Sequence, residues 1–185
     1  MQKQKKIGLI GCGRITSKHI EAALANKERL LLVACCDPIL ERAQRRAQEY
    51  RAGVSSGSDV TIYSDYHDML AKEKPDICTI ATESGHHPRI VIDCLEAGSH
   101  VICEKPMALS TRDADAMVDA ARRNNRKLAV CFQNRFNPPV QRARAALEAG
   151  RFGKMLHGMV QVRWNRDADY YAQAPWRGTW ALDGG

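Results

Sequence analysis

Short apolar runs alternate with helix-like segments from the start of the chain to about Phe136, and this alternation constrains the fold more than any other feature. Buried parallel strands are short and apolar on both faces, and a crossover, usually a helix, must join each to the next. The pattern therefore predicts βαβ units and an α/β fold with a doubly wound parallel sheet. The predicted strands are Lys6 to Ile10, Leu30 to Cys36, Thr61 to Tyr63, Asp76 to Thr82, His100 to Cys103 and Lys127 to Phe132.

Two of the intervening segments have clear helical signals. Thr111 to Arg126 carries apolar residues at helical spacing, and Ser110-Thr-Arg-Asp113 at its start is a capping-box pattern. His87 to Ala97 also has one apolar side, and Gly98 follows it as a natural C′ residue. We expect both segments to be helices.

The pattern changes after Phe136. Asn137-Pro-Pro139 opens a helical segment that ends at Gly150, and Lys154 to Trp164 then reads as one long strand with a single apolar face. Such a strand is typical of a one-sided antiparallel sheet. We predict that residues 137–185 begin a second, α+β domain, and that Lys154 to Trp164 finds no later strand in the chain to pair with.

The net charge of +7 excludes little by itself, because the basic residues are spread out. Lys3 to Lys6, Arg42 to Arg46 and Arg122 to Lys127 each fall on a terminus or on the polar side of a predicted helix, so we interpret them as solvated faces. With 6% aromatic residues there is no basic stripe interleaved with aromatic platforms. Nucleic-acid binding is not expected, whereas an anionic small ligand is compatible with the charge.

Cysteine usage and hydropathy point to an ordinary intracellular protein. The seven cysteines are odd in number, form no C-x-x-C pair and mostly lie in apolar runs, so we predict neither a disulfide framework nor a metal site. No apolar run approaches the ~20 residues of a membrane helix, and the first residues lack a signal-peptide core. We expect a cytoplasmic protein with no membrane partner.

The first predicted strand leads into Gly11-Cys-Gly13-Arg-Ile-Thr16, which opens a helix. In such a turn the first glycine permits a tight bend, the second lets the backbone approach a diphosphate, and the helix N-terminus offers unpaired N–H groups. Thr16 stands where the dinucleotide fingerprint prefers Gly or Ala. The motif alone therefore leaves a plain glycine turn as an alternative.

Asp37 ends the second predicted strand, close to the ~20 residues beyond the glycines that a ribose-binding acid requires. A carboxylate there repels a 2′-phosphate, and no basic residue follows until Arg42, so NAD is favoured over NADP. Asp37 could equally be a helix N-cap with Pro38 at N1. A methyltransferase would share the same turn and acid.

Two further loops follow the fourth and fifth strands, where ligands bind in open parallel sheets. They contain Thr82-Glu-Ser-Gly-His86-His87-Pro and Glu104-Lys105-Pro106. A surface salt bridge is the alternative role for Lys105. The two histidines make a poor metal motif because no carboxylate or cysteine stands at ligand spacing.

Together these motifs resemble the Gfo/Idh/MocA oxidoreductases, the family of glucose-fructose oxidoreductase and inositol dehydrogenase. The resemblance covers essentially the whole chain in the right order. Its most specific parts are the Glu-Lys-Pro motif and the tryptophan-rich end. It rests on Gly11-x-Gly13, Thr82-x-Ser-Gly-x-His87-Pro, Ala97 to Met107, Phe132-Gln-Asn-Arg-Phe136 and Trp176-Arg-Gly-Thr-Trp-Ala-Leu-Asp-Gly-Gly185.

The resemblance implies a Rossmann domain over residues 1–136, with residues 137–185 as the incomplete start of a substrate and oligomerisation domain. The activity implied is hydride transfer between NAD and a hydroxyl carbon of a sugar, cyclitol or nucleotide sugar, with Lys105 as general base or proton relay. Family members continue with a catalytic histidine and an antiparallel sheet, through which we expect homo-oligomers. The portion in hand is expected to be inactive alone, and a truncated, non-catalytic NAD-binding or nucleotide-sensing protein is the alternative.

The resemblance also implies a set of site residues. His87 matches a loop residue near the nicotinamide ribose, Asn134 and its neighbours line the cleft, and the tryptophan-rich segment reaches cofactor or substrate. The cofactor-binding residues expected are Gly11, Cys12, Gly13, Arg14, Ile15, Asp37, Thr82, His87, Glu104, Lys105, Gln133, Arg135, Trp176 and Arg177.

Overall fold

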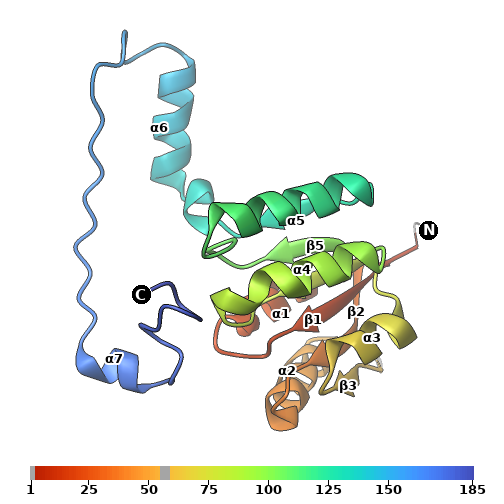
Figure 1. Cartoon of the computed structure of the whole chain (residues 1–185). Helices are drawn as coiled ribbons and strands as arrows, with labels where there is room; N and C mark the ends of the chain where they lie inside the picture. Colours follow the sequence, from red (N-terminus) through yellow and green to blue (C-terminus); the bar gives the residue numbers. More distant parts are fainter. Residues whose placement is uncertain (1–2, 55–58) are drawn as a thin grey trace. The chain divides into compact units, whose positions relative to one another are not determined.

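The computed structural model describes residues 3–54 and 59–185 (Figure 1). The chain forms two compact units. The first comprises Met1–Cys131 together with Gly178–Gly185, and the second is Phe132–Arg177. In the described part of the chain no helix is long and apolar enough to cross a bilayer.

A six-stranded, fully parallel sheet forms the centre of the first unit. The strand order is β3-β2-β1-β4-β5-β6, the order of a dinucleotide-binding Rossmann fold. The order reverses between β1 and β4, so the loops after these strands diverge and leave room for a ligand. The strands are β1 (Lys5–Ile10), β2 (Leu30–Cys36), β3 (Thr61–Tyr63), β4 (Ile77–Ile80), β5 (His100–Cys103) and β6 (Leu128–Val130).

Helices cover both faces of this sheet (Figure 1). On one face α1 (Thr16–Ala25) and α2 (Leu40–Ala52) bury Ile20, Ala47 and Tyr50 against β1 and β2. The other face is covered by α3 (Tyr66–Glu73), α4 (His87–Glu96) and α5 (Thr111–Arg123), which bury a second cluster against β4 and β5. The predicted α/β fold with a doubly wound parallel sheet is confirmed.

Local signals set the ends of the helices as expected. The Ser110 hydroxyl accepts a hydrogen bond from the Asp113 N–H at 3.1 Å and donates one to the Asp113 carboxylate at 2.7 Å. The first of these bonds is the N-cap half of the predicted capping box, whereas the Asp113 carboxylate binds the Ser110 hydroxyl rather than the Ser110 backbone N–H. Gly98 follows α4 with φ +92°, a conformation that suits glycine at C′.

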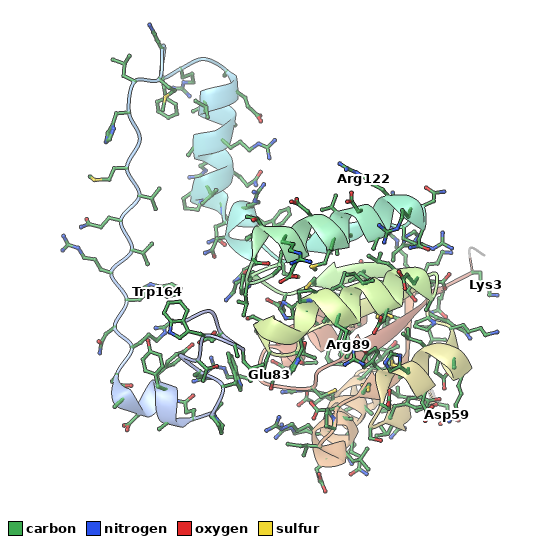
Figure 2. The ribbon with its side chains drawn as sticks, in the orientation of Figure 1. Lys3, Asp59, Glu83, Arg89, Arg122 and Trp164 are labelled. Atoms are coloured by element: carbon green, nitrogen blue, oxygen red, sulfur yellow. The ribbon has the colours of Figure 1, made fainter. Side chains whose placement is uncertain are left out.

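The prediction that the basic residues of Arg42 to Arg46 form a solvated face is wrong at one position. Arg122 lies on the exposed side of α5 as predicted (Figure 2). Arg46, however, is buried rather than solvated. It lies on the same side of α2 as Ala43, Ala47 and Tyr50, which face the core. Its guanidinium is paired inside the protein, which makes its burial possible.

The second unit contains a short 3₁₀ helix η2 (Gln133–Phe136), the predicted helix α6 (Pro138–Glu148), and α7 (Ala168–Ala172), which was not predicted. Asp167 caps α7 by accepting a hydrogen bond from the Tyr170 N–H at 3.0 Å. This cap is an N-terminal signal that the sequence already contained.

The predicted strand Lys154 to Trp164 is wrong for this structure. The segment is an extended chain without strand pairing (Figure 1). Its side chains project on both sides (Figure 2). Alternating polarity favours a strand, but a strand is defined by ladder hydrogen bonds to a neighbour. No such neighbour lies within residues 3–54 and 59–185, so the antiparallel part of the predicted second domain is not seen. Trp164 remains 72% exposed.

Candidate functional site

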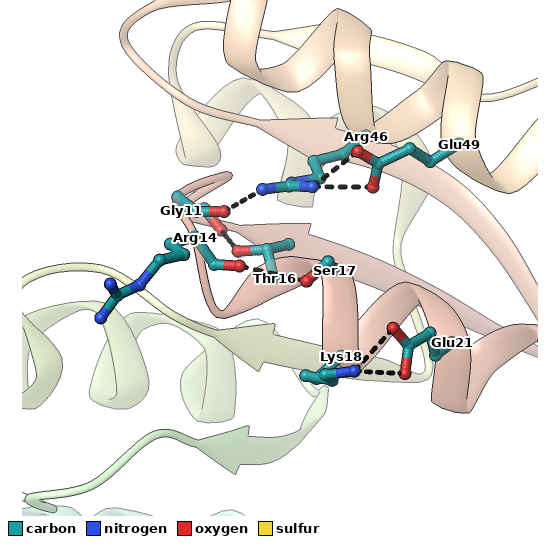
Figure 3. A network of polar contacts seen from close by, with 9 residues as sticks. Gly11, Arg14, Thr16, Ser17, Lys18, Glu21, Arg46 and Glu49 are labelled. Atoms are coloured by element: carbon teal, nitrogen blue, oxygen red, sulfur yellow. Dashed lines mark hydrogen bonds and ion pairs between the residues drawn. The ribbon is translucent and has the colours of Figure 1, made fainter.

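The glycine loop joins β1 to α1 and is closely packed at its first glycine (Figure 3). Gly11 has φ +83°, and a Cβ there would lie 2.6 Å from the Ala81 carbonyl group. The buried Thr16 hydroxyl donates to the Gly11 carbonyl at 2.8 Å. Threonine in place of the usual third small residue is therefore explained, since its side chain closes the turn from within.

The second glycine faces open space. A Cβ on Gly13 would meet no described atom within 4 Å. Behind the loop, the buried Arg46 donates to the Gly13 carbonyl at 2.5 Å and pairs with Glu49 at 2.7 Å (Figure 3). Arg46 is a site residue that the sequence reasoning missed. Its spacing of three residues from Ala43 and four from Tyr50 on α2 was the available signal.

Helix α1 begins with its backbone donors uncovered. Its N-cap is Ile15, and among the described residues no side chain caps the helix and no acid stands in its first turn. Arg14 and Ile15 are exposed, and the Arg14 side chain extends away from the loop (Figure 3). An uncapped helix N-terminus beside an open glycine is a suitable site for an anionic group.

Cys12 contributes only its backbone to this loop. Its side chain is completely buried, and a hydrogen bond with Cys35, together with burial, holds the pKa of its thiol far above the ordinary range. Burial and the neighbouring Cys12 likewise raise the pKa of Cys36 to about 12. All seven cysteines lie in the described ranges and are free thiols, as predicted.

Asp37 lies at the end of β2, only 5% exposed, and its carboxylate is fixed by two backbone donors. One oxygen accepts from the Cys12 N–H at 2.8 Å and the other from the Ile39 N–H at 2.9 Å. Asp37 is therefore not the N-cap of α2, which begins at Leu40 after Ile39. The short turn through Pro38 separates them. Each oxygen keeps a lone pair for another donor.

His87 at the start of α4 joins two loops of the first unit. It is 1% exposed, and its Nδ1 and Nε2 lie 2.8 and 3.1 Å from the carbonyl oxygens of Pro106 and Thr82. Each ring nitrogen thus faces a backbone carbonyl oxygen of a different loop. The imidazole fixes the loop after β4 against the loop after β5.

Glu104 and Lys105 follow β5 and have different environments. Glu104 is half-buried, with its carboxylate against His19 and the Lys105 N–H. The ammonium of Lys105 is exposed, and among residues 3–54 and 59–185 no ion pair or side-chain hydrogen bond involves it. The salt-bridge alternative for Lys105 therefore has no support.

The remaining predicted residues lie in the second unit. Arg177 donates to the Tyr170 carbonyl at 2.6 Å and to Gln173 at 2.9 Å, with its guanidinium 4.2 Å from the Tyr170 ring centroid. Arg135 lies 5.4 Å from the ring of Phe132. Gln133, Arg135, Trp176 and Arg177 all belong to this unit, and their roles at the cofactor stay predictions.

The last residues of the chain belong to the first unit and reach the loop after β4. The Gly85 N–H donates to the Leu182 carbonyl at 3.1 Å. A Cβ on Gly85 would lie 2.1 Å from the Ala181 carbonyl oxygen. Only glycine at position 85 permits this approach.

The carboxyl ends of β1, β2, β4 and β5 therefore gather the glycine loop, Asp37, Thr82, His87 and the Glu104-Lys105 pair at one edge of the sheet. The oxidoreductase family with an NAD-binding Rossmann fold, Gfo/Idh/MocA, matches residues 5–132. The chain belongs to this family.

Several relatives are similar over most of the chain. D-glucoside 3-dehydrogenase of Escherichia coli is 31% identical over 150 residues, which are 81% of this chain and 41% of that protein. The WlbA dehydrogenase of Chromobacterium violaceum, solved with NADH and UDP-GlcNAcA, is 36% identical with a TM-score of 0.89 over 98% of this chain and 50% of its own. WlbA of Bordetella pertussis, solved with the same two ligands, is 38% identical with a TM-score of 0.87, covering 98% and 53%. The chain thus spans about half the length of these relatives.

Proposed function

We propose that this chain supplies the cofactor-binding part of an NAD-dependent dehydrogenase that acts on a hydroxyl-bearing carbon of a nucleotide sugar. The observation that carries the proposal is the arrangement at the sheet edge: an open glycine loop follows β1, a buried carboxylate follows β2, and an unpaired lysine follows β5. The glycine loop suits the diphosphate of a dinucleotide, the carboxylate suits its adenosine ribose, and the lysine suits the proton transfer that accompanies hydride transfer.

The residues present fit the cofactor. The open space at Gly13 and the uncapped start of α1 would receive the diphosphate, with backbone N–H groups as donors. The fixed carboxylate of Asp37 would accept hydrogen bonds from the adenosine ribose hydroxyls. A 2′-phosphate at that point would meet a buried negative charge. We therefore propose NAD rather than NADP as the cofactor.

Bound NAD would supply the hydride acceptor, and the chain's own residues would position it and handle the proton. His87 would hold the loops carrying Thr82 and Lys105 together, because its buried ring lies between carbonyl oxygens of both loops. In its neutral amine form, Lys105 would accept the hydroxyl proton and pass it to solvent. Its exposed, unpaired side chain leaves it available for this step.

The substrate class proposed is a UDP-linked sugar acid. The two WlbA relatives, which match 98% of this chain, were solved with UDP-GlcNAcA, and the net charge of +7 suits an anionic ligand. Gln133, Arg135, Trp176 and Arg177 are proposed as residues of the cofactor and substrate cleft. Arginine guanidinium groups suit phosphate and carboxylate recognition.

The test uses the protein as its gene encodes it. Purified enzyme with NAD should reduce the cofactor with UDP-GlcNAcA, followed by nicotinamide absorbance, and should be slower with a glucoside or with myo-inositol. Turnover with the latter two and none with the nucleotide sugar would refute the substrate assignment. Failure to bind NAD would refute the function as a whole.

We also propose a reducing compartment, the cytoplasm, because seven free thiols, six of them buried, need no oxidising environment. Homo-oligomers are proposed on the exposed apolar side chains of the second unit, which include Leu156, Val160 and Trp164. Free-thiol titration of freshly isolated protein and its solution mass would test the two statements.

A further inference from the structure

Three side chains from different elements meet beside the Glu104-Lys105 loop. His19 comes from the first turns of α1, Glu104 follows β5, and Cys131 follows β6. In the described ranges they are the one group of three whose candidate metal-ligand atoms all lie within 4.8 Å of one another. The His19 and Glu104 side chains are only 15% and 12% exposed. His19 and Cys131 lie outside the glycine turn, the Thr82 to Pro88 loop and the Glu104-Lys-Pro motif.

Hydrogen bonds inside this cluster hold the Glu104 carboxylate on both of its oxygens. Oε1 lies 3.0 Å from His19 Nε2, and Oε2 accepts from the Lys105 N–H at 3.3 Å. Burial alone would raise the pKa of Glu104, but the hydrogen bond and charge of His19, with those of Lys105, outweigh it and lower the pKa. An ionised carboxylate only accepts, so His19 must carry the proton on Nε2.

The third side chain of the cluster, Cys131, is also a neighbour of the Glu104 carboxylate. Burial, and then the neighbouring Glu104, raise the pKa of its thiol to about 11. At neutral pH the thiol keeps its proton and is available as a donor to the carboxylate. The cluster is therefore a set of donors arranged around one half-buried carboxylate.

We infer that His19 is a positioning residue for the nicotinamide half of the cofactor, acting through Glu104 on the backbone of Lys105. This inference rests on the proposed function. The strand order separates the two halves of a dinucleotide: Asp37 follows β2 on one side of β1, whereas Glu104 follows β5 on the other. Helix α1 begins at the diphosphate position between them. The same helix that meets the diphosphate thus also fixes the loop on the nicotinamide side.

The inference predicts different effects on the affinities for two ligands, NAD and ADP-ribose, which share the adenosine diphosphate. ADP-ribose lacks the nicotinamide and does not depend on the Glu104-Lys105 loop. NAD depends on it. Loss of the His19 donor should therefore weaken the binding of NAD and leave the binding of ADP-ribose unchanged.

The experiment compares His19→Leu, His19→Gln and the control Lys18→Ala. Lys18 is a neighbouring α1 residue whose side chain, in the described part of the chain, is hydrogen-bonded only to the exposed Glu21. Calorimetric Kd values for NAD and ADP-ribose and the Tm are measured for each. His19→Leu should weaken NAD about tenfold, the scale of one charge-assisted hydrogen bond. ADP-ribose should stay within about twofold. His19→Gln, which restores a donor, should recover most of the NAD affinity, and Lys18→Ala should match the wild type.

Three outcomes would overturn the inference. Equal losses of NAD and ADP-ribose, in step with a lower Tm, would make His19 merely structural. Unchanged NAD affinity in His19→Leu would remove it from the site. Stoichiometric Zn²⁺ binding to the wild type, abolished by His19→Leu and by Cys131→Ala, would make the cluster a metal site. If the wild type bound neither nucleotide, the proposed function itself would fail.

Discussion

Substituting alanine at the two glycines of the first loop separates folding from cofactor binding. Gly11→Ala places a methyl group 2.6 Å from the Ala81 carbonyl carbon and oxygen and 2.7 Å from the Thr82 nitrogen, all backbone atoms that cannot rotate away. The left-handed conformation at φ +83° adds roughly 1–2 kcal/mol, and the overpacking roughly 1–3 kcal/mol. A loss of about 3 kcal/mol in the free energy of unfolding is expected, which corresponds to a Tm lower by about 6–12 °C.

Gly13→Ala is the matched control, because its Cβ meets no described atom within 4 Å and its φ is not positive. Its stability should be unchanged or higher by about 0.4–1 kcal/mol. The methyl group would instead occupy the space proposed for the diphosphate, so NAD affinity should fall at least about tenfold. Thermal unfolding followed by circular dichroism and NADH fluorescence titration measure the two effects. A Gly13→Ala protein that binds NAD like the wild type would refute the placement of the diphosphate.

Three other predictions address the site and the second unit. Asp37→Ala should reduce the preference for NAD over NADP, measured by titrating both cofactors, and an unaltered preference would count against the proposed ribose contact. Lys105→Ala, in the protein as its gene encodes it, should lose turnover on the order of 100-fold or more while keeping Tm and NAD affinity; unchanged turnover would remove it from the mechanism. The 185-residue chain alone should form oligomers or aggregates in light scattering. A chain ending near Phe136 should aggregate less and retain some NAD affinity. A monodisperse, active 185-residue monomer would contradict this reading.

The sheet was predictable because its information is local and periodic. Leu30–Cys36 and His100–Cys103 were predicted to the residue, since each apolar run is bounded by polar or turn residues. The segment Lys154 to Trp164 has an equally clear pattern, yet it is not a strand here. The alternation of apolar and polar residues shows which side chains prefer burial. Strand pairing also requires a neighbouring strand, which this alternation does not reveal.

Within the candidate site, the residues at the ends of strands were easier to place from the sequence than those within helices. The glycines, Asp37 and Lys105 occupy strand ends, and topology brings strand ends together. Arg46 and His19 lie within helices, where a charged residue usually faces water. Their partners, the Gly13 carbonyl and Glu104, are distant in the sequence and are matched to them only by packing.

The close approach of Gly85 to Ala181 and Leu182 has a consequence for the order of events during synthesis. The loop after β4 leaves the ribosome roughly 100 residues before the segment that it receives, a delay of about 5–20 s at ordinary elongation rates. The sheet and its nucleotide-side loops therefore have time to form before this last contact closes. A nascent chain paused near residue 150 would test the idea: it should already retain NAD, with the Gly85 amide still exchanging with solvent.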